Sequence, residues 1–550
     1  MSDKSPRITP LAVGLLIAIM LAGWLLYRLP HAAVPSADQA VAQSEPSVKP
    51  TASSPSGALN ELRRKNADEK NRARLQRRLE QKDARAHEAV LTFESDEAYR
   101  KFLTRAGEAG LKLRGQIDRL RTVRVGYNSL DPLFDDMMGH PSDYQGADAN
   151  YLVHVPGTPA AEDRPKINQV PLGNNSLNFL GVVGDHSQWG RGVTVAVLDT
   201  GVAQDLTLGG GRVQYLDAGQ GILPGTGTED GHGTAVAGLV AGASPDAPGV
   251  ASAANILSIR ITGADGTSDS FTLAQGILAA VDAGARIINI SMGAYASPPV
   301  LTSAIDYAYA QGAVIVAAAG NDGAAQLTWP AADPRVVSVG AVDALEQQVS
   351  FSNAGAQLKI TAPGYGVDTA WLNGQRVSMD GTSASAPLVA GAIAAVMSTT
   401  PGLTAPQAWS VLQQYASDGG PPGPDPAYGN GILNLGWAMN RNDPTRVDTA
   451  IAGQYYDATT GLMNIVVQNR SAQAAGGLQL NVEIGGVTTS HTLPPLNPGE
   501  TALIQSPVSA EQLAATGGVF YRSQLINPGG VVDQSPVNNV KSGVILAPAK

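Results

Sequence analysis

The sequence predicts an α/β protein with a doubly wound, mostly parallel sheet, preceded by a small α+β module and followed by an antiparallel β-sandwich. In the centre of the chain, continuous apolar runs alternate with helical patterns. A shorter mixture of strand and helix patterns precedes this region, and short strands between Gly- and Pro-containing turns follow it. Because 550 residues exceed what one hydrophobic core accommodates, several domains are expected.

Composition limits the classes of function. The net charge of -10 argues against nucleic acid as a partner. The chain has no cysteine, which excludes disulfides, thiol catalysis and Cys-ligated zinc. Residues 61–125 are an exception to the acidic balance, with 18 Lys and Arg against 11 Asp and Glu. Such a basic segment could be solvated, or it could pack against the acidic remainder of the chain.

The N-terminus carries a membrane or export signal. Lys4 and Arg7 precede an apolar run over residues 11–27, which is 17 residues long and near the lower limit for a membrane span. Residues 1–33 are therefore either a signal anchor or a cleaved signal peptide. Both interpretations predict an extracytoplasmic protein, membrane-anchored with its N-terminus inside or secreted. Residues 34–57, rich in Ser, Pro and Ala, are predicted to be a flexible linker.

The next segments are predicted as a charged helix, a small module and a linker. Residues 58–88 have too few apolar positions for a buried face, so a solvated helix or short coiled coil is expected. Residues 89–126 have a strand–helix–strand–strand pattern, with Ser95 or Asp96 as the helix cap. Residues 127–182 are predicted to be an irregular linker with one strand at 151–155.

The central and C-terminal regions have different strand patterns. Over residues 183–443, apolar strands that suit a sheet buried on both faces are expected at 193–198, 256–259, 287–290, 314–318 and 336–339. Helices are expected between them, at 235–243, 271–283 and 301–311. Over residues 444–550, short strands are expected at 464–469, 478–484, 488–493 and 518–525, at the spacing of a β-sandwich.

Three polar residues stand at points where the predicted elements begin or end. Asp199 follows a buried strand, where ligands of parallel sheets bind. His232 lies between two glycines at a helix start and can act as general base and then acid. Ser383 opens an apolar helix, whose terminal N–H groups can stabilise an oxyanion. Taken singly, each could be only a cap, a turn or a core residue. Together, Asp199, His232 and Ser383 suit an orienting carboxylate, a base and a nucleophile, respectively.

A fourth segment, AAAGNDG, places Asn321 at the end of another strand, where its amide could donate to a developing oxyanion. The four segments, VAVLDTGV, EDGHGTAVAG, AAAGNDG and DGTSASAPLVAG, resemble those of the subtilisin-like serine proteases. The resemblance covers about residues 183–440. It implies a serine endopeptidase with a triad of Asp199, His232 and Ser383 and with Asn321 in the oxyanion hole.

The same resemblance implies further features. Ser291, Met292 and Gly293 would pair with substrate backbone, while Ala318, Ala319 and Gly320 would wall an open specificity pocket. Pro330 would follow a cis peptide bond. Residues 89–126 resemble the family's propeptide, and residues 444–550 resemble a CARDB or fibronectin-type domain.

The resemblance also has limits. Ala384 and Leu388 replace the frequent Met and His, which changes packing rather than chemistry. No cofactor is required. Structural calcium is possible, but no metal ligands can be assigned, because Asp230, Asp265 and Asp269 could equally be ordinary loop carboxylates.

The expected partners are protein or peptide substrates, the membrane through residues 11–27, and an intramolecular propeptide. The alternative function is a catalytically silent subtilase fold used for binding or for envelope adhesion.

Overall fold

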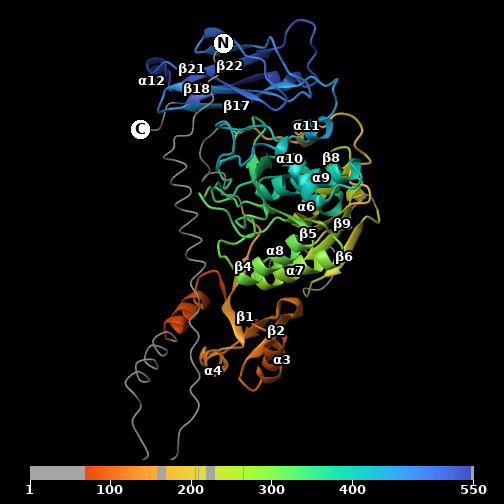
Figure 1. Cartoon of the computed structure of the whole chain (residues 1–550), viewed down its shortest axis with the longest axis vertical. Coiled ribbons are helices and arrows are strands. Elements are labelled where there is room, and N and C mark those ends of the chain that lie inside the picture. Colours follow the sequence, from red (N-terminus) through yellow and green to blue (C-terminus); the bar gives the residue numbers. More distant parts are fainter. Residues whose placement is uncertain are drawn as a thin grey trace, which may run out of the picture. The chain divides into compact units, whose positions relative to one another are not determined.

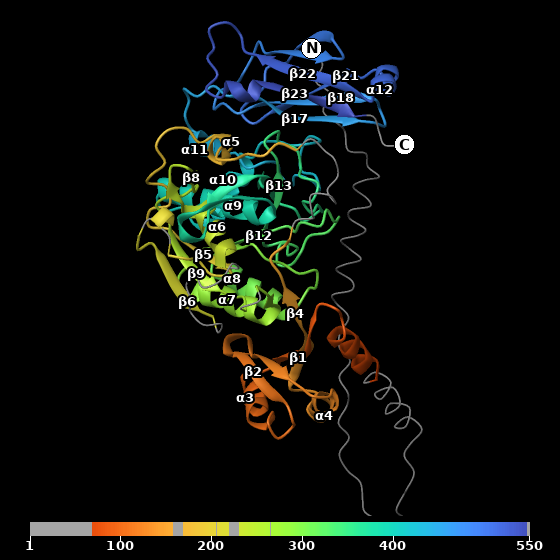
Figure 2. The ribbon, with the colours of Figure 1, turned by 180° about the vertical axis from the view of Figure 1, so that it is seen from behind.

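The computed structural model describes residues 69–157, 169–204, 206–208, 210–218, 230–263 and 266–546. All of them belong to one compact unit, residues 66–550. The predicted anchor at 11–27 and the linker at 34–57 lie outside the described residues. Figures 1 and 2 show three parts in chain order: a small N-terminal module, a central α/β domain and a C-terminal β domain.

The N-terminal module is built on an antiparallel sheet with the strand order β10-β4-β1-β3-β2. Helix α3 begins after Ser95, whose side chain accepts from Ala98 N and so satisfies a free N–H of the first turn. Phe93 and Phe102 are fully buried in the module's core. The elements are β1 (Ala84–Phe93), α3 (Asp96–Arg105), β2 (Lys112–Ile117), η1 (Asp118–Leu120), β3 (Thr122–Gly126), α4 (Asp131–Gly139) and β4 (Tyr144–Val153).

This module extends beyond the predicted 89–126 range on both sides. Helix 69–79 places Leu75 and Leu79 in the module's core rather than leaving them solvated. On the other side, α4 and β4 fall in the region expected to be an irregular linker. The difference arises because one or two apolar side chains suffice when a small neighbouring sheet supplies the rest of the contact surface.

The central domain contains a parallel sheet of seven strands in the order β14-β13-β12-β11-β5-β9-β6. The strands are short and mostly buried, as the continuous apolar runs predicted. They are β5 (Thr194–Asp199), β6 (Val213–Asp217), β9 (Asn255–Arg260), β11 (Ile287–Ile290), β12 (Val314–Ala318), β13 (Val337–Val342) and β14 (Ile360–Pro363).

Helices cover both faces of this sheet. Alternate residues of β5 divide between two hydrophobic clusters: Val195 and Val197 pack with α6 and α9, whereas Ala196 and Leu198 pack with α7 and α8. Figure 2 shows α7 and α8 together and separate from α6 and α9. The helices are α5 (Ser176–Phe179), α6 (Asp230–Ala241), α7 (Ser270–Asp282), α8 (Pro299–Ala310), α9 (Thr382–Thr399), α10 (Ala405–Gln414) and α11 (Leu435–Asn440).

Short elements complete this domain. They are η3 (Leu206–Leu208), β7 (Ala243–Ser244), β8 (Ala247–Pro248), β10 (Ser268–Asp269), β15 (Val367–Ala370), η4 (Leu372–Gly374) and β16 (Arg376–Met379). Of these, β10 pairs antiparallel with β4 of the N-terminal module, so one strand of the module's sheet comes from the central domain.

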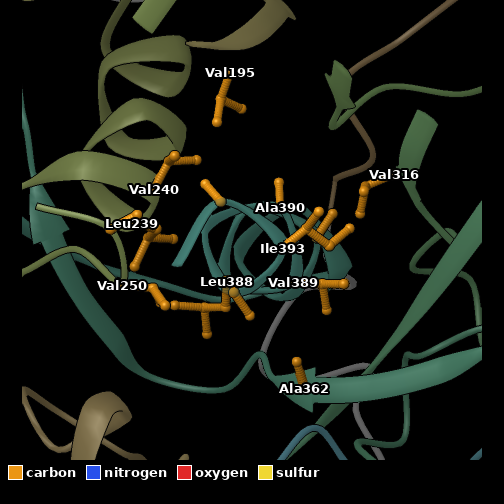
Figure 3. Packing of buried hydrophobic residues seen from close by; sticks show 14 of the residues in the cluster. Val195, Leu239, Val240, Val250, Val316, Ala362, Leu388, Val389, Ala390 and Ile393 are labelled. Carbon is orange, nitrogen blue, oxygen red and sulfur yellow. The ribbon is translucent and has the colours of Figure 1, made fainter. Parts of the chain in front are cut away.

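Helix α9 is the central helix of one layer. Figure 3 shows Leu388, Val389, Ala390 and Ile393 directed toward side chains of α6 and of the sheet. Within the described residues, α9 is the one helix long and apolar enough to cross a membrane, and 83% of it is buried inside the domain. Its apolar composition therefore reflects its place in the core, which holds the start of the helix in a defined position.

The C-terminal domain consists of two antiparallel sheets that enclose a hydrophobic cluster, which includes Ile465, Val467, Leu480 and Val482. One sheet has the order β17-β18-β21 and the other β20-β19-β22-β23. The elements are β17 (Thr449–Asp457), β18 (Leu462–Asn469), β19 (Gln479–Ile484), β20 (Val487–Thr492), β21 (Thr501–Pro507), α12 (Ala510–Thr516), β22 (Gly518–Ile526), η5 (Pro536–Asn539) and β23 (Val540–Leu546).

Candidate active site

Asp199 and His232 lie in direct contact. Asp199 is the last residue of β5 and is completely buried. Its Oδ1 lies 2.7 Å from Nδ1 of His232, near the start of α6. Asp199 Oδ1 also accepts from Thr200 N at 2.8 Å, which fixes the carboxylate. A buried carboxylate in this position holds the imidazole with a proton on Nδ1 and leaves Nε2 able to accept one.

The glycines on both sides of His232 are required by close packing. A Cβ on Gly233 would lie 2.1 Å from the carbonyl oxygen of Gly201, and one on Gly231 would lie 2.3 Å from the Trp371 ring. Gly233 N also donates to Thr200 Oγ1 at 3.0 Å. Because Gly233 lacks a side chain, the start of α6 can approach the loop after β5, and this approach brings the imidazole to Asp199. Because Gly231 lacks one, the Trp371 ring can pack against the same turn.

Ser383 is the second residue of α9 and is almost fully buried, with 2% of its surface exposed. Its Oγ donates to the Ser291 carbonyl at 3.2 Å, and Ser291 Oγ donates to the Ser383 carbonyl at 3.2 Å. Among the residues that the structure describes, Nε2 of His232 has no hydrogen-bond partner. The nucleophile and base candidates are therefore present, with the serine hydroxyl directed at the backbone that follows β11 rather than at the imidazole.

Asn321 connects the end of β12 to the start of α9. Its Oδ1 accepts from both the backbone N and the Oγ1 of Thr382, each at 2.9 Å. These two bonds orient the side-chain amide, so its Nδ2 points the other way and donates to the carbonyl of Pro156 at 2.9 Å. A fixed N–H donor aimed at a peptide carbonyl is the arrangement that stabilises an oxyanion.

The chain that follows β4 lies along the candidate site. His154 and Gly293 form an antiparallel bridge, with His154 N donating to Gly293 O at 3.1 Å and Gly293 N donating to His154 O at 2.9 Å. Two residues further on, the Pro156 carbonyl reaches Asn321. Residues 154–156 therefore approach the site as an added strand, which is a common mode of peptide recognition.

The residues expected to bind substrate differ in where their side chains lie. Met292 and Ala319 are buried in the cluster formed with α7 and α8, and Ala318 is buried in the cluster formed with α9. Ser291 contacts Ser383, while Gly293 and Gly320 bring bare backbone close to Thr328. The peptide bond before Pro330 is cis, as the resemblance implied.

Asn353 is a residue of the site that the sequence did not indicate. It is fully buried, its Oδ1 accepts from Asp322 N at 3.0 Å and Ala324 N at 2.9 Å, and its Nδ2 donates to Ala319 O at 3.2 Å. These bonds hold the turn on both sides of Asn321. Because Asn353 lies in a loop after a different strand, no local motif revealed its role.

A tyrosine completes this network. Tyr295 donates to Asp322 Oδ2 at 2.5 Å and accepts from Asn353 Nδ2 at 3.0 Å. Burial and the bond to Asp322 raise the pKa of Tyr295 to about 12, so the hydroxyl keeps its proton at neutral pH.

Of the three carboxylates considered as calcium ligands, Asp269 has a different role. It caps α7 by accepting from Thr272 N at 2.8 Å, and it pairs with Arg124 at 3.0 Å and Arg85 at 3.3 Å. The Asp230 side chain and Asp265 lie outside the described residues. Within the described part of the chain, no group of three or more His, Asp or Glu side chains could hold a metal.

A doubly wound α/β domain with an Asp–His pair, a serine at a helix start and an amide donor beside it is the fold and site of a serine peptidase. Comparison with known proteins identifies the family. The subtilase family model matches residues 190–431. The thermostable alkaline protease of Halalkalibacterium halodurans is 35% identical over 49% of this chain and 73% of its own length. Subtilisin BL of Lederbergia lenta is 36% identical over 44% and 90%.

The chain belongs to the subtilase family and is a serine endopeptidase. A solved structure agrees on the fold: the epidermin leader peptide processing serine protease from Staphylococcus aureus matches with a TM-score of 0.52 and 20% identity. That match covers 65% of this chain and 98% of the other.

Proposed function

We propose that Asp199, His232 and Ser383 are the catalytic triad, that Asn321 is the oxyanion donor, and that the segment ending at Pro156 is an intramolecular propeptide. The observation that carries this proposal is the hydrogen bond from Asn321 Nδ2 to the Pro156 carbonyl at 2.9 Å. Through this bond, a peptide carbonyl of the segment that follows β4 contacts the proposed oxyanion donor. The bond that would be cut is Pro156–Gly157.

The chemistry follows from the geometry. Ser383 Oγ attacks the carbonyl carbon while His232 Nε2 takes its proton, and Asp199 stabilises the resulting imidazolium. The negative oxygen of the tetrahedral intermediate accepts from Asn321 Nδ2 and lies at the N-terminus of α9. The imidazolium then protonates the leaving amine, and water attacks the acyl-enzyme by the same route. No step requires a cofactor.

The conformation of Ser383 suggests why the segment 154–156 is bound rather than cleaved rapidly. Ser383 Oγ donates to the Ser291 carbonyl, and proline has no N–H with which to compete for that acceptor. To react, the Ser383 hydroxyl must rotate toward His232 Nε2, which is free to accept within the described residues. Catalytic hydrogen bonds are often long or misaligned before the reactive complex forms.

Contacts away from the cleft support an inhibitory propeptide. Arg124 and Arg85 of the basic segment pair with Asp269 of the central domain, and Arg119 pairs with Asp282 at 3.3 Å. These contacts agree with the expectation, based on charge, that the basic segment packs on the acidic domain. The Asn150 side chain adds a cap to α7 by accepting from Phe271 N at 3.2 Å.

Two measurements test these proposals. A fluorophosphonate probe should label the wild-type protein and fail to label a Ser383→Ala variant; equal labelling of both would refute the triad. N-terminal sequencing of the mature protein should give a chain that begins at Gly157. A single intact species that is fully active with the module attached would contradict an inhibitory propeptide.

We also propose that the protease is exported and that its uncleaved form is tethered through residues 11–27, because this apolar run follows Lys4 and Arg7. The uncleaved Ser383→Ala protein should stay in the membrane pellet after alkaline extraction, and the same variant lacking residues 1–33 should not. Release of the full-length protein by alkaline extraction would refute the tether.

A further inference from the structure

Thr328 fills a space that two glycines leave at the candidate site. A Cβ placed on Gly293 would lie 2.4 Å from Thr328 Oγ1, and one placed on Gly320 would lie 3.0 Å from Thr328 Cγ2. Gly293 pairs with His154 of the segment bound at the site, and Gly320 precedes Asn321. The threonine side chain therefore lies between the backbone expected to pair with substrate, at Gly293, and the backbone expected to wall the specificity pocket, at Gly320.

The position of this side chain is held from several directions. Thr328 N donates to Ala319 O at 3.0 Å, and Thr328 Oγ1 lies 3.3 Å from Ala319 O and 3.4 Å from Ala318 O. The next residue, Trp329, exchanges two backbone hydrogen bonds with Ala294, at 2.7 and 3.1 Å. Thr328 is 5% exposed and β-branched, so its side chain has few alternative rotamers. A substrate cannot easily displace it.

We propose that Thr328 closes the pocket for the residue before the scissile bond, so that this protease prefers substrates with a small side chain there, such as Ala or Ser, over Phe, Tyr or Leu. The inference rests on the proposed function, because it takes the cleft beside Asn321 to be the substrate site. It differs from the open pocket expected from Ala318, Ala319 and Gly320 alone. The residue whose carbonyl contacts Asn321 agrees with this preference, since it is Pro156, which has a compact side chain.

A peptide series tests the preference directly. The substrates share one sequence and differ only in having Ala, Leu or Phe before the scissile bond, and the enzyme is the processed protein obtained from the full chain. Each methylene that a pocket cannot accept changes kcat/KM by about 10–200-fold. The wild-type protein should cleave the Ala peptide at least about ten times more efficiently than the Phe peptide.

Variants of Thr328 test whether this residue causes the preference for a small side chain. Thr328→Gly should lower the Ala-to-Phe ratio by at least about tenfold, because it removes the side chain between the walls. Thr328→Val is the matched control: it keeps the volume, loses the hydroxyl and should retain the ratio. If the Gly variant does not fold, Thr328→Ala and Thr328→Ser, which remove less, should shift the ratio in the same direction.

The outcomes separate the two proposals. A wild-type protein that cleaves the Phe peptide as well as the Ala peptide overturns the inference without need of any variant. An active Thr328→Gly protein with an unchanged ratio also overturns it. In both cases, fluorophosphonate labelling of Ser383 would leave the proposed function standing. Loss of labelling in the wild-type protein would instead refute the proposed function.

Discussion

Asn353 is predicted to act through Asn321, and Asn353→Ala is the variant that tests this. The substitution removes the acceptor for two backbone N–H groups, of Asp322 and Ala324, and the donor to Ala319 O. Because Asn353 is fully buried, these groups lose partners that water cannot readily replace. At about 1–3 kcal/mol for each unsatisfied group, with partial relaxation, the free energy of unfolding should fall by about 2–4 kcal/mol.

The catalytic effect should be separable from this loss of stability. The turn that carries Asn321 loses its support on both sides, and a displacement of about 1 Å costs about 100-fold in rate. Loss of the oxyanion donor itself costs about 100- to 1000-fold in kcat. We therefore expect Asn353→Ala to lower kcat by about 10- to 100-fold with little change in KM, measured by peptide hydrolysis well below the unfolding temperature.

A double-mutant cycle decides between positioning and general damage. If Asn353 acts through Asn321, the double variant with Asn321→Ala should have nearly the kcat of Asn321→Ala alone. Asn353→Ser, which retains a short polar side chain, should recover part of the activity. Strictly additive losses in kcat, or a wild-type kcat in a destabilised Asn353→Ala protein, would refute the reasoning.

Three other predictions concern single residues. Asp199→Asn should lower kcat by about 10⁴-fold, because the imidazole tautomer is lost, and a smaller effect than tenfold in peptide hydrolysis would contradict its role. Gly233→Ala should abolish activity, since its Cβ would lie 2.1 Å from Gly201 O, whereas a Cβ on Gly210, also in the central domain, would have no atom within 4 Å, so the control Gly210→Ala should be as active as wild type. Burial raises the pKa of Asp418 to about 6, above its unfolded value of about 3.9. Between these two pKa values the folded state binds the proton more tightly than the unfolded state does. The free energy of unfolding should therefore fall by about 2 kcal/mol as pH rises from 4 to 6. Urea unfolding of the inactive Ser383→Ala protein should show this decrease in stability with pH, and adding Asp418→Asn should remove it. The same decrease in both proteins would contradict a role for Asp418.

The parallel sheet and the four site segments could be predicted because their signals are local. The apolar run at 193–198 corresponds to β5, and Asp199, His232 and Ser383 lie where strand ends and helix starts were expected. Each depends on a few neighbouring residues: glycines that permit close approach, or a helix start that presents free N–H groups. A motif of this kind is visible wherever its residues are adjacent in the chain.

Contacts between distant segments could not be predicted in the same way. Leu75 and Leu79 seemed too few for a buried face, yet they join the core of the N-terminal module. The strand at 144–153 was expected only in part, at 151–155, because its pairing partners are β1 and β10, which lie far away in the sequence. Pairing across such distances leaves little trace in local periodicity.

The sequence by itself determined the fold class, the order of the polar site residues and the charge contrast between the N-terminal segment and the rest. Only the tertiary structure decided which peptide carbonyl lies at Asn321, that Asn353 supports the turn, and that Thr328 fills the gap between Gly293 and Gly320. The physical reason is the range of the interactions. Hydrophobic periodicity and helix caps act over a few residues, whereas the shape of a pocket depends on side chains that only folding brings together.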